Sequence, residues 1–154
     1  MTVTFQTETW DQYYNDPSRH GLWQEHYEEF KKIHLDRMEM NPDVGLYQAL
    51  DKSGALSITV ARKSGTMIGY CLVVVRPHIH YSRALCGFED SYFVTMAQRE
   101  GLTGYKLLAY AITECKRRGC LKIYFMTKEF NSIELLLTRL EMVKEDSVFA
   151  KWLR

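Results

Sequence analysis

The run SYFVTMAQREGLTGYKLLAYAITECKRR, residues 91–118, determines how the rest of the sequence is interpreted. It opens with bulky strand-forming residues and passes through a polar loop that holds Gly101 and Gly104. Apolar residues then recur on one face of a helix: Leu107, Leu108, Ala111, Ile112 and Cys115. The order predicts a strand, a glycine loop and a helix. Backbone N–H groups at such a helix start lack intrahelical partners and carry partial positive charge, so they suit a phosphate.

Composition places the chain among ordinary soluble globular proteins. The 154 residues are 46% hydrophobic and 25% charged, and they suit a single domain. A net charge of +1 gives no electrostatic case for nucleic acid or an anionic membrane as a partner. The four cysteines lack CxxC or Cys/His spacing, so we expect free thiols and no metal site.

The N-terminal ten residues have neither the basic segment nor the apolar core of a signal peptide. The longest apolar run, residues 70–75, is too short to cross a bilayer. We therefore expect a cytoplasmic protein.

The remaining sequence alternates between helical and strand patterns. Helices are expected over residues 22–38, 44–50 and 131–140, and strands over residues 55–62, 67–76, 84–95, 121–126 and 147–153. Residues 77–81 are expected to leave the sheet, and residues 1–19 to form a polar and aromatic arm. In the first helix the charged residues, Glu25, Glu28, Glu29, Lys31 and Lys32, are expected to face water.

The loop REGLTG, residues 99–104, resembles the R/Q-x-x-G-x-G/A loop of the GCN5-related N-acetyltransferase (GNAT) family. Arg99 and Gly104 match the pattern, Leu102 replaces the middle glycine, and Gly101 comes one residue early. The order of elements over residues 20–153 also resembles that fold. The resemblance implies one domain over residues 1–154, of the α/β class, with a mixed, mostly antiparallel sheet, splayed parallel fourth and fifth strands, and flanking helices.

A narrower resemblance concerns three further runs. GYCLVVVRPHIHY, FEDSYFV and GYKLL are similar to a subgroup of GNAT proteins encoded by tailed bacteriophages. For a phage protein, the expected compartment is the host cytoplasm.

The family resemblance implies acetyl-coenzyme A as cofactor. Its pantetheine arm would lie along the strand edge formed by Phe93, Val94 and Thr95. Its pyrophosphate would bind the loop residues Arg99, Glu100, Gly101, Thr103 and Gly104. Asn131 matches a residue that often contacts the cofactor, although helix capping explains it equally well.

Three residues are candidates for the base that accepts the proton of the amine. Glu89 and Asp90 precede the cofactor edge, and neighbouring strand residues face opposite ways, so at most one should enter the cleft. Simple alternation selects Asp90, but a bulge expected in this strand can invert the count. His80, two residues after His78, is the third candidate, because a neutral histidine is a competent base.

One departure from the family pattern concerns the general acid. Leu137 stands where relatives commonly have a tyrosine. Either water or another residue such as Tyr124 protonates the leaving thiolate, or catalysis is weak or absent.

Two functions follow from the resemblance. The first is an N-acetyltransferase that acts on a primary amine of a small molecule or protein. The second is a catalytically weak or inactive GNAT-fold protein that acts as a binding, virion-associated or host-inhibiting module. The sequence leaves the acceptor and the oligomeric state open, and a homodimer is compatible with it.

Overall fold

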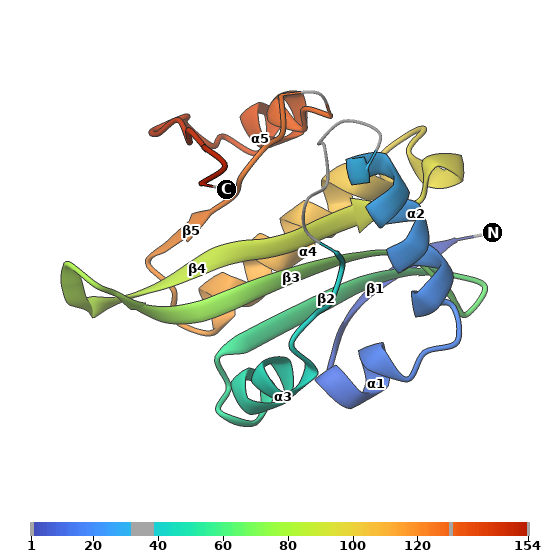
Figure 1. Cartoon of the computed structure of the whole chain (residues 1–154), viewed down its shortest axis with the longest axis horizontal. Coiled ribbons are helices and arrows are strands. Elements are labelled where there is room, and N and C mark those ends of the chain that lie inside the picture. The colour runs from blue at the N-terminus through green and yellow to red at the C-terminus, as the bar shows by residue number, and fades with distance from the viewer. Residues whose placement is uncertain (1, 32–38, 130, 154) are drawn as a thin grey trace.

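A computed structural model describes residues 2–31, 39–129 and 131–153. Its centre is a five-stranded sheet in the order β1-β2-β3-β4-β5 (Figure 1). The strands are β1 (Val3–Glu8), β2 (Leu56–Lys63), β3 (Thr66–His78), β4 (Tyr81–Val94) and β5 (Lys122–Tyr124). Neighbouring strands from β1 to β4 are antiparallel, whereas β5 is parallel to β4. The predicted mixed sheet is confirmed.

Helices cover both faces of this sheet. The short α1 (Trp10–Tyr14), α2 (Arg19–Lys31) and α3 (Val44–Lys52) lie on one face, and α4 (Thr103–Arg117) lies on the other (Figure 1). The first face buries a core that includes Trp10, Tyr13, Tyr70, Leu72 and Phe93. The second buries Cys71, Val73, Val94, Leu107 and Ala111. Burial of apolar surface on both faces stabilises the three-layer arrangement.

The strand, loop and helix predicted around residues 91–118 are present. Helix α4 buries the apolar stripe Leu107, Leu108, Ala111 and Cys115, and Gly119 follows it with a φ of 87°. That φ lies in the left-handed region that favours glycine, as expected for the residue after a helix end. The last helix, α5 (Glu134–Arg139), is shorter than the predicted 131–140.

Residues 1–19 are expected to form an arm, but the first of them form a strand of the sheet. Strand β1 pairs with β2 from Val3 to Glu8, and α1 follows with Thr9 as a capping-box residue. Sequence reasoning missed β1 because an edge strand with few buried residues carries a weak apolar pattern. The expected helix over residues 22–38 corresponds to α2, and residues 32–38 lie outside the described residues.

Two other expectations differ from the structure. Residues 77–81 do not leave the sheet, because β3 and β4 form a long hairpin in which His78 pairs with Tyr81. Residues 147–153 are not a strand, and Phe149 and Leu153 are 94% and 89% exposed. Alternating apolar residues form a strand only against a partner edge, and β5 offers an edge of three residues.

Within the described ranges, no helix is both long enough and apolar enough to cross a membrane. All four cysteines are free thiols, and three of them are buried.

Candidate active site

The sheet opens into a fork between β4 and β5. The two strands pair only through Cys86–Lys122, Gly87–Ile123 and Phe88–Tyr124. Beyond that point β4 continues to Val94 without β5 beside it. Glu89 lies where the strands separate, and its Oε2 accepts a hydrogen bond from the backbone N–H of Met126 at 3.3 Å.

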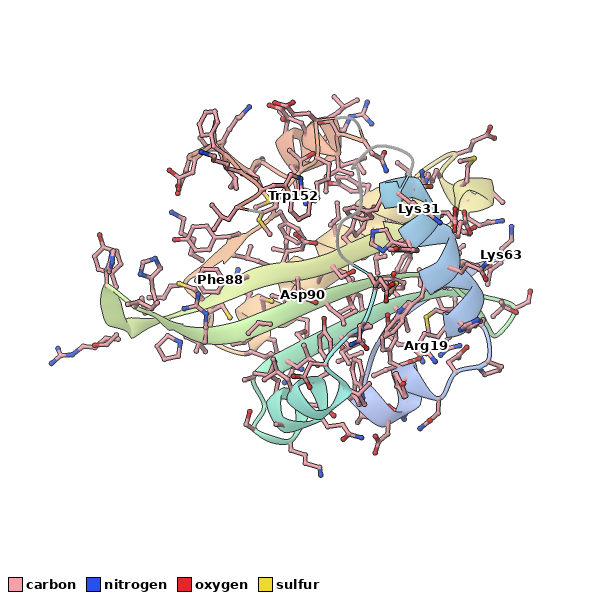
Figure 2. The ribbon with its side chains drawn as sticks, in the orientation of Figure 1. Arg19, Lys31, Lys63, Phe88, Asp90 and Trp152 are labelled. Atoms are coloured by element: carbon pink, nitrogen blue, oxygen red, sulfur yellow. The ribbon has the colours of Figure 1, made fainter. Side chains whose placement is uncertain are left out.

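A β-bulge in β4 decides which way the two candidate carboxylates face. Ser91 pairs with Leu72 and Glu89 pairs with Val73, so Asp90 is the extra residue. Leu72 belongs to the core beneath α1 and α2, and Val73 belongs to the core beneath α4. Because directly paired residues share a face, Glu89 faces the α4 side. Asp90, which is labelled on the sheet in Figure 2, faces the opposite side, where Tyr47 of α3 donates a hydrogen bond to it.

A cavity of about 540 Å³ lies at the fork and receives side chains from both faces of the sheet. Both Glu89 and Asp90 line it. The expectation that at most one of them enters the cleft is therefore wrong. The alternation rule holds for each face of a continuous sheet, but here the missing strand pairing lets side chains from both faces reach one cavity.

Glu89 has the properties of a base that works near neutral pH. Its side chain is half-buried, and burial raises its pKa from 4.5 to about 7. The negative charge of Asp90 raises the pKa further, while the Met126 N–H and Lys128 oppose the shift. A carboxyl group that titrates near 7 can accept a proton and release it again.

Asp90 accepts a hydrogen bond from a residue of α3. The hydroxyl group of Tyr47 donates to its Oδ2 at 2.6 Å, and the carboxylate is otherwise exposed. Burial and the neighbouring Asp90 raise the pKa of Tyr47. The tyrosine therefore stays protonated and keeps donating. The ring of Tyr47 stacks on that of Trp10, with centroids 4.5 Å apart.

His26 also lines the cavity, although sequence reasoning gave it no role. Its ring stacks on Phe93 at 4.6 Å, and its Nδ1 is 2.7 Å from the hydroxyl oxygen of Tyr70. Burial, assisted by Arg99 and Lys128, lowers the pKa of His26 to about 4. The neutral ring is too weak a base to compete with Glu89, so we assign it to the wall of the cavity.

The glycine loop connects β4 to α4 through a short 3-10 turn, Met96–Gln98. Gly101 has a φ of 86°, which favours glycine, and open space surrounds its Cα. Gly104 is needed for a different reason: a Cβ there would lie 2.6 Å from the hydroxyl oxygen of Tyr92. The N-cap residue of α4, Leu102, makes no side-chain capping hydrogen bond. The N–H groups of the first turn therefore suit an anionic ligand.

Two glutamates of α2 bind this loop. Glu29 accepts from Nη2 of Arg99 at 2.5 Å and from Nδ2 of Asn131 at 3.1 Å. Glu25 accepts from the hydroxyl of Thr95 at 2.7 Å and from the N–H of Met96 at 2.8 Å. Sequence reasoning placed both glutamates on a water-facing surface. Their i, i+4 spacing only shows that they share one face of α2, not what that face contacts.

The predicted cofactor residues divide into two groups. Phe93, Val94, Arg99, Gly104 and Asn131 line the cavity. The other four, Thr95, Glu100, Gly101 and Thr103, belong to the same β4–α4 connection but do not line it.

His80 is not close to these residues. It lies at the tip of the β3–β4 hairpin, which projects from the body of the protein, and its N–H donates to Nδ1 of His78 at 3.2 Å (Figure 1). The structure does not bring it to Glu89. Tyr124 stacks on Phe88 at 5.0 Å and does not line the cavity; Leu136 does, whereas Leu137 does not.

Comparison with known proteins assigns this arrangement to a family. The sequence matches the profile of the acetyltransferase (GNAT) family over residues 8–139. The chain belongs to the GNAT family. This membership confirms the predicted class of enzyme, an acetyltransferase, and the predicted fold. No curated protein matches the sequence at a significant level.

Solved structures share the GNAT fold at low sequence identity. An aminoglycoside acetyltransferase from an uncultured soil metagenomic sample, in complex with trehalose, has a TM-score of 0.73 at 12% identity; the match covers 99% of this chain and 97% of that one. A ribosomal-protein-alanine N-acetyltransferase from Brucella melitensis biovar Abortus has a TM-score of 0.70 at 14% identity, with 99% of each chain covered. A predicted acetyltransferase from Clostridium acetobutylicum, solved with acetyl-CoA, has a TM-score of 0.69 at 11% identity, covering 99% and 97%.

Proposed function

We propose that this GNAT protein transfers an acetyl group from acetyl-coenzyme A to a primary amine of a small molecule or protein. One observation carries the proposal: a carboxyl group with a pKa raised to about 7, Glu89, lies at the fork of β4 and β5. An amine acceptor is protonated in water and attacks only as the neutral amine. A base at this position can remove the ammonium proton and so produce the neutral amine.

The residues at the fork fit the cofactor. The first turn of α4 has no side-chain cap, and the space around Gly101 is open, so backbone N–H groups there would hold the pyrophosphate. Arg99 would add its positive charge. Phe93 and Val94 at the end of β4 and Thr95 after it form an edge with no β5 strand beside it, and this edge would hold the pantetheine arm. Acetyl-coenzyme A would supply the activated acetyl thioester.

The proposed roles of this chain's own residues follow from their positions. Glu89 takes the proton of the ammonium group. We assign the proton for the leaving thiolate to water. Leu137 has no acidic group, and Tyr124 does not line the cavity. Burial raises the pKa of three tyrosines that do line it, Tyr47, Tyr70 and Tyr92.

Thiol release in the presence of acetyl-coenzyme A and amines tests the proposal. Glu89→Gln keeps the size of the side chain and an acceptor for the Met126 N–H, but it cannot take a proton. We expect its kcat to fall by roughly 100-fold or more, with cofactor affinity changed by less than about threefold. A Glu89→Gln enzyme with wild-type kcat would remove Glu89 as the base.

A second candidate is a GNAT-fold protein without turnover, as proposed above for a phage-encoded binding or host-inhibiting module. Leu137 in place of the tyrosine and Leu102 in place of the middle glycine favour it. Gly104→Trp separates the two: it should abolish acetyl transfer by the enzyme, but it should leave binding of a protein partner intact if the fold serves only as a module.

A further inference from the structure

The cavity carries more acidic than basic groups on its described walls. Four carboxyl groups line it, Glu29, Glu39, Glu89 and Asp90, against two cationic side chains, Arg99 and Lys128. His26 adds no charge near pH 7, because its pKa is lowered to about 4. Arg99 is already paired with Glu29 at the cofactor end. Lys128 acts on Glu89, which is only partly ionised near pH 7. The acidic excess therefore lies toward Glu39 and Asp90, and it favours a cationic acceptor.

The aromatic walls support the same conclusion. Tyr13, Trp23, Tyr27, Tyr47, Tyr70 and Phe93 line the cavity. Several are fixed in place: the indole N–H of Trp23 donates to the hydroxyl oxygen of Tyr13 at 2.6 Å, and Tyr47 stacks on Trp10. Rigid aromatic rings attract cations and bury aliphatic chains. The cavity thus suits a ligand with positive charge and an apolar body.

The side chains of Glu89 and Asp90 point in opposite directions, so they have different roles. Glu89 faces the fork, and Asp90 faces α3 on the other side of β4. The two carboxylates therefore do not serve the same nitrogen atom. Tyr47 occupies only Oδ2 of Asp90, so this exposed group retains accepting capacity for a further donor.

We propose, on the basis of the proposed function, that the acceptor is an aliphatic diamine, a dication whose two ammonium groups are joined by an apolar spacer. One amino group reacts beside Glu89, and the second ammonium group pairs with Asp90. The reacting nitrogen loses its charge when it gives its proton to Glu89, so it cannot balance Asp90. A second ammonium group that stays charged throughout the reaction does so.

The reaction is balanced with one acetyl group transferred. The neutral amine nitrogen forms a C–N bond to the acetyl carbon as the C–S bond breaks. The nitrogen atom loses its second, surplus proton to water, the thiolate takes a proton from water, and Glu89 returns the proton of the ammonium group to solvent. The second ammonium group is unchanged, and the product is a monoacetylated monocation.

Three acceptors of matched length test this inference at saturating acetyl-coenzyme A. The reference acceptor is 1,5-diaminopentane. Hexylamine carries a methyl group in place of one ammonium group, and 6-aminohexanoate carries a carboxylate in the same place. We expect kcat/KM for the diamine to exceed that for hexylamine by about two- to fivefold, the equivalent of one ion pair with an exposed carboxylate. The aminohexanoate should be the poorest acceptor.

Asp90→Asn tests the assigned partner. The diamine-to-hexylamine ratio should fall toward one, because the amide keeps the shape but not the charge of the side chain. Asp146→Asn is the matched control, since Asp146 is exposed and does not line the cavity. It changes the net charge equally and should leave the ratio at its wild-type value.

The outcomes distinguish this inference from the proposed function. Equal kcat/KM for diamine and hexylamine in the wild type overturns the inference but leaves an amine acetyltransferase. Acetyl-coenzyme A binding without acetylation of any acceptor in this set also overturns it. Loss of both acetyl-coenzyme A binding and thiol release would overturn the proposed function itself. The ratio of kcat/KM for the diamine to kcat/KM for hexylamine in the wild type tests the inference even if Asp90→Asn fails to fold.

Discussion

Glu29 in α2 and Arg99 in the glycine loop form an ion pair of 2.5 Å, with Asn131 on the second oxygen of the same carboxylate. We propose that the side chain of Arg99 contacts the cofactor, and the family resemblance implies the same for Asn131. A carboxylate therefore binds the same donors that a phosphate would use. Helix α2 and the loop are connected through this one side chain and through Glu25.

The first prediction concerns competition between the Glu29 carboxylate and a cofactor phosphate for Arg99. Glu29→Gln removes a negative charge beside the phosphate site and releases Arg99. We expect the Kd for coenzyme A to decrease about three- to tenfold, measured by calorimetry at low ionic strength, where charge effects are least screened. Glu28→Gln, on the exposed side of α2, is the control and should change little. Weaker binding by Glu29→Gln would show instead that Glu29 positions Arg99 for the phosphate.

The pH dependence of the reaction should report Glu89. The base form of a group with a pKa of about 7 is scarce at pH 6 and dominant at pH 8. We expect kcat/KM, expressed for the ammonium form of the acceptor, to rise about tenfold per pH unit below 7 and to level off above it. The profile of residual activity in Glu89→Gln should lack this inflection. An unchanged inflection in that variant would assign it to another group.

The same group should affect stability with a defined sign. The pKa of Glu89 is raised on folding, so the folded state binds the proton more tightly than the unfolded state does. Its stabilising contribution is complete below about pH 4.5 and is lost as the pH rises through about 7. Glu89→Gln should therefore be more stable than the wild type at pH 8, by about 1–3 kcal/mol, with no gain at pH 4.5. Urea denaturation at both pH values measures this, and lower stability of the variant at pH 8 would contradict the burial argument.

Gly104 and Tyr92 should be coupled. In Gly104→Ala the new methyl group would lie 2.6 Å from the Tyr92 hydroxyl, so one of them must move. We expect a loss of about 1–3 kcal/mol in unfolding free energy, as in other overpacked sites. Tyr92→Phe removes the clashing oxygen and should restore most of the loss in the double variant, which a double-mutant cycle measures. Additive effects would show that the contact is not the cause.

Sequence reasoning recovered β2, β3, β4 and α4 because long apolar patterns define them. The hairpin of β2 and β3 and the stripe on α4 are buried almost throughout. It missed β1 and predicted a strand over residues 147–153, because strand formation at an edge depends on partners that local pattern does not reveal.

The candidate site was predictable only in part. The loop motif located Arg99 and Gly104, but the roles of Glu29, Tyr47 and His26 depend on contacts between residues far apart in the chain. The choice between Glu89 and Asp90 depended on a bulge at one residue, and a shift of one residue exchanges the two faces of a strand. Spacing could not resolve that choice.

Calorimetric titration of the wild-type protein with acetyl-coenzyme A, with Gly104→Trp as the parallel sample, tests the central claim most directly. We predict binding of the wild type in the micromolar range, about −8 kcal/mol, and none by the variant, whose indole cannot fit beside Tyr92 and would displace the start of α4. Absence of binding by the wild type, or equal binding by both proteins, would contradict the assignment of the fork and the glycine loop as the cofactor site.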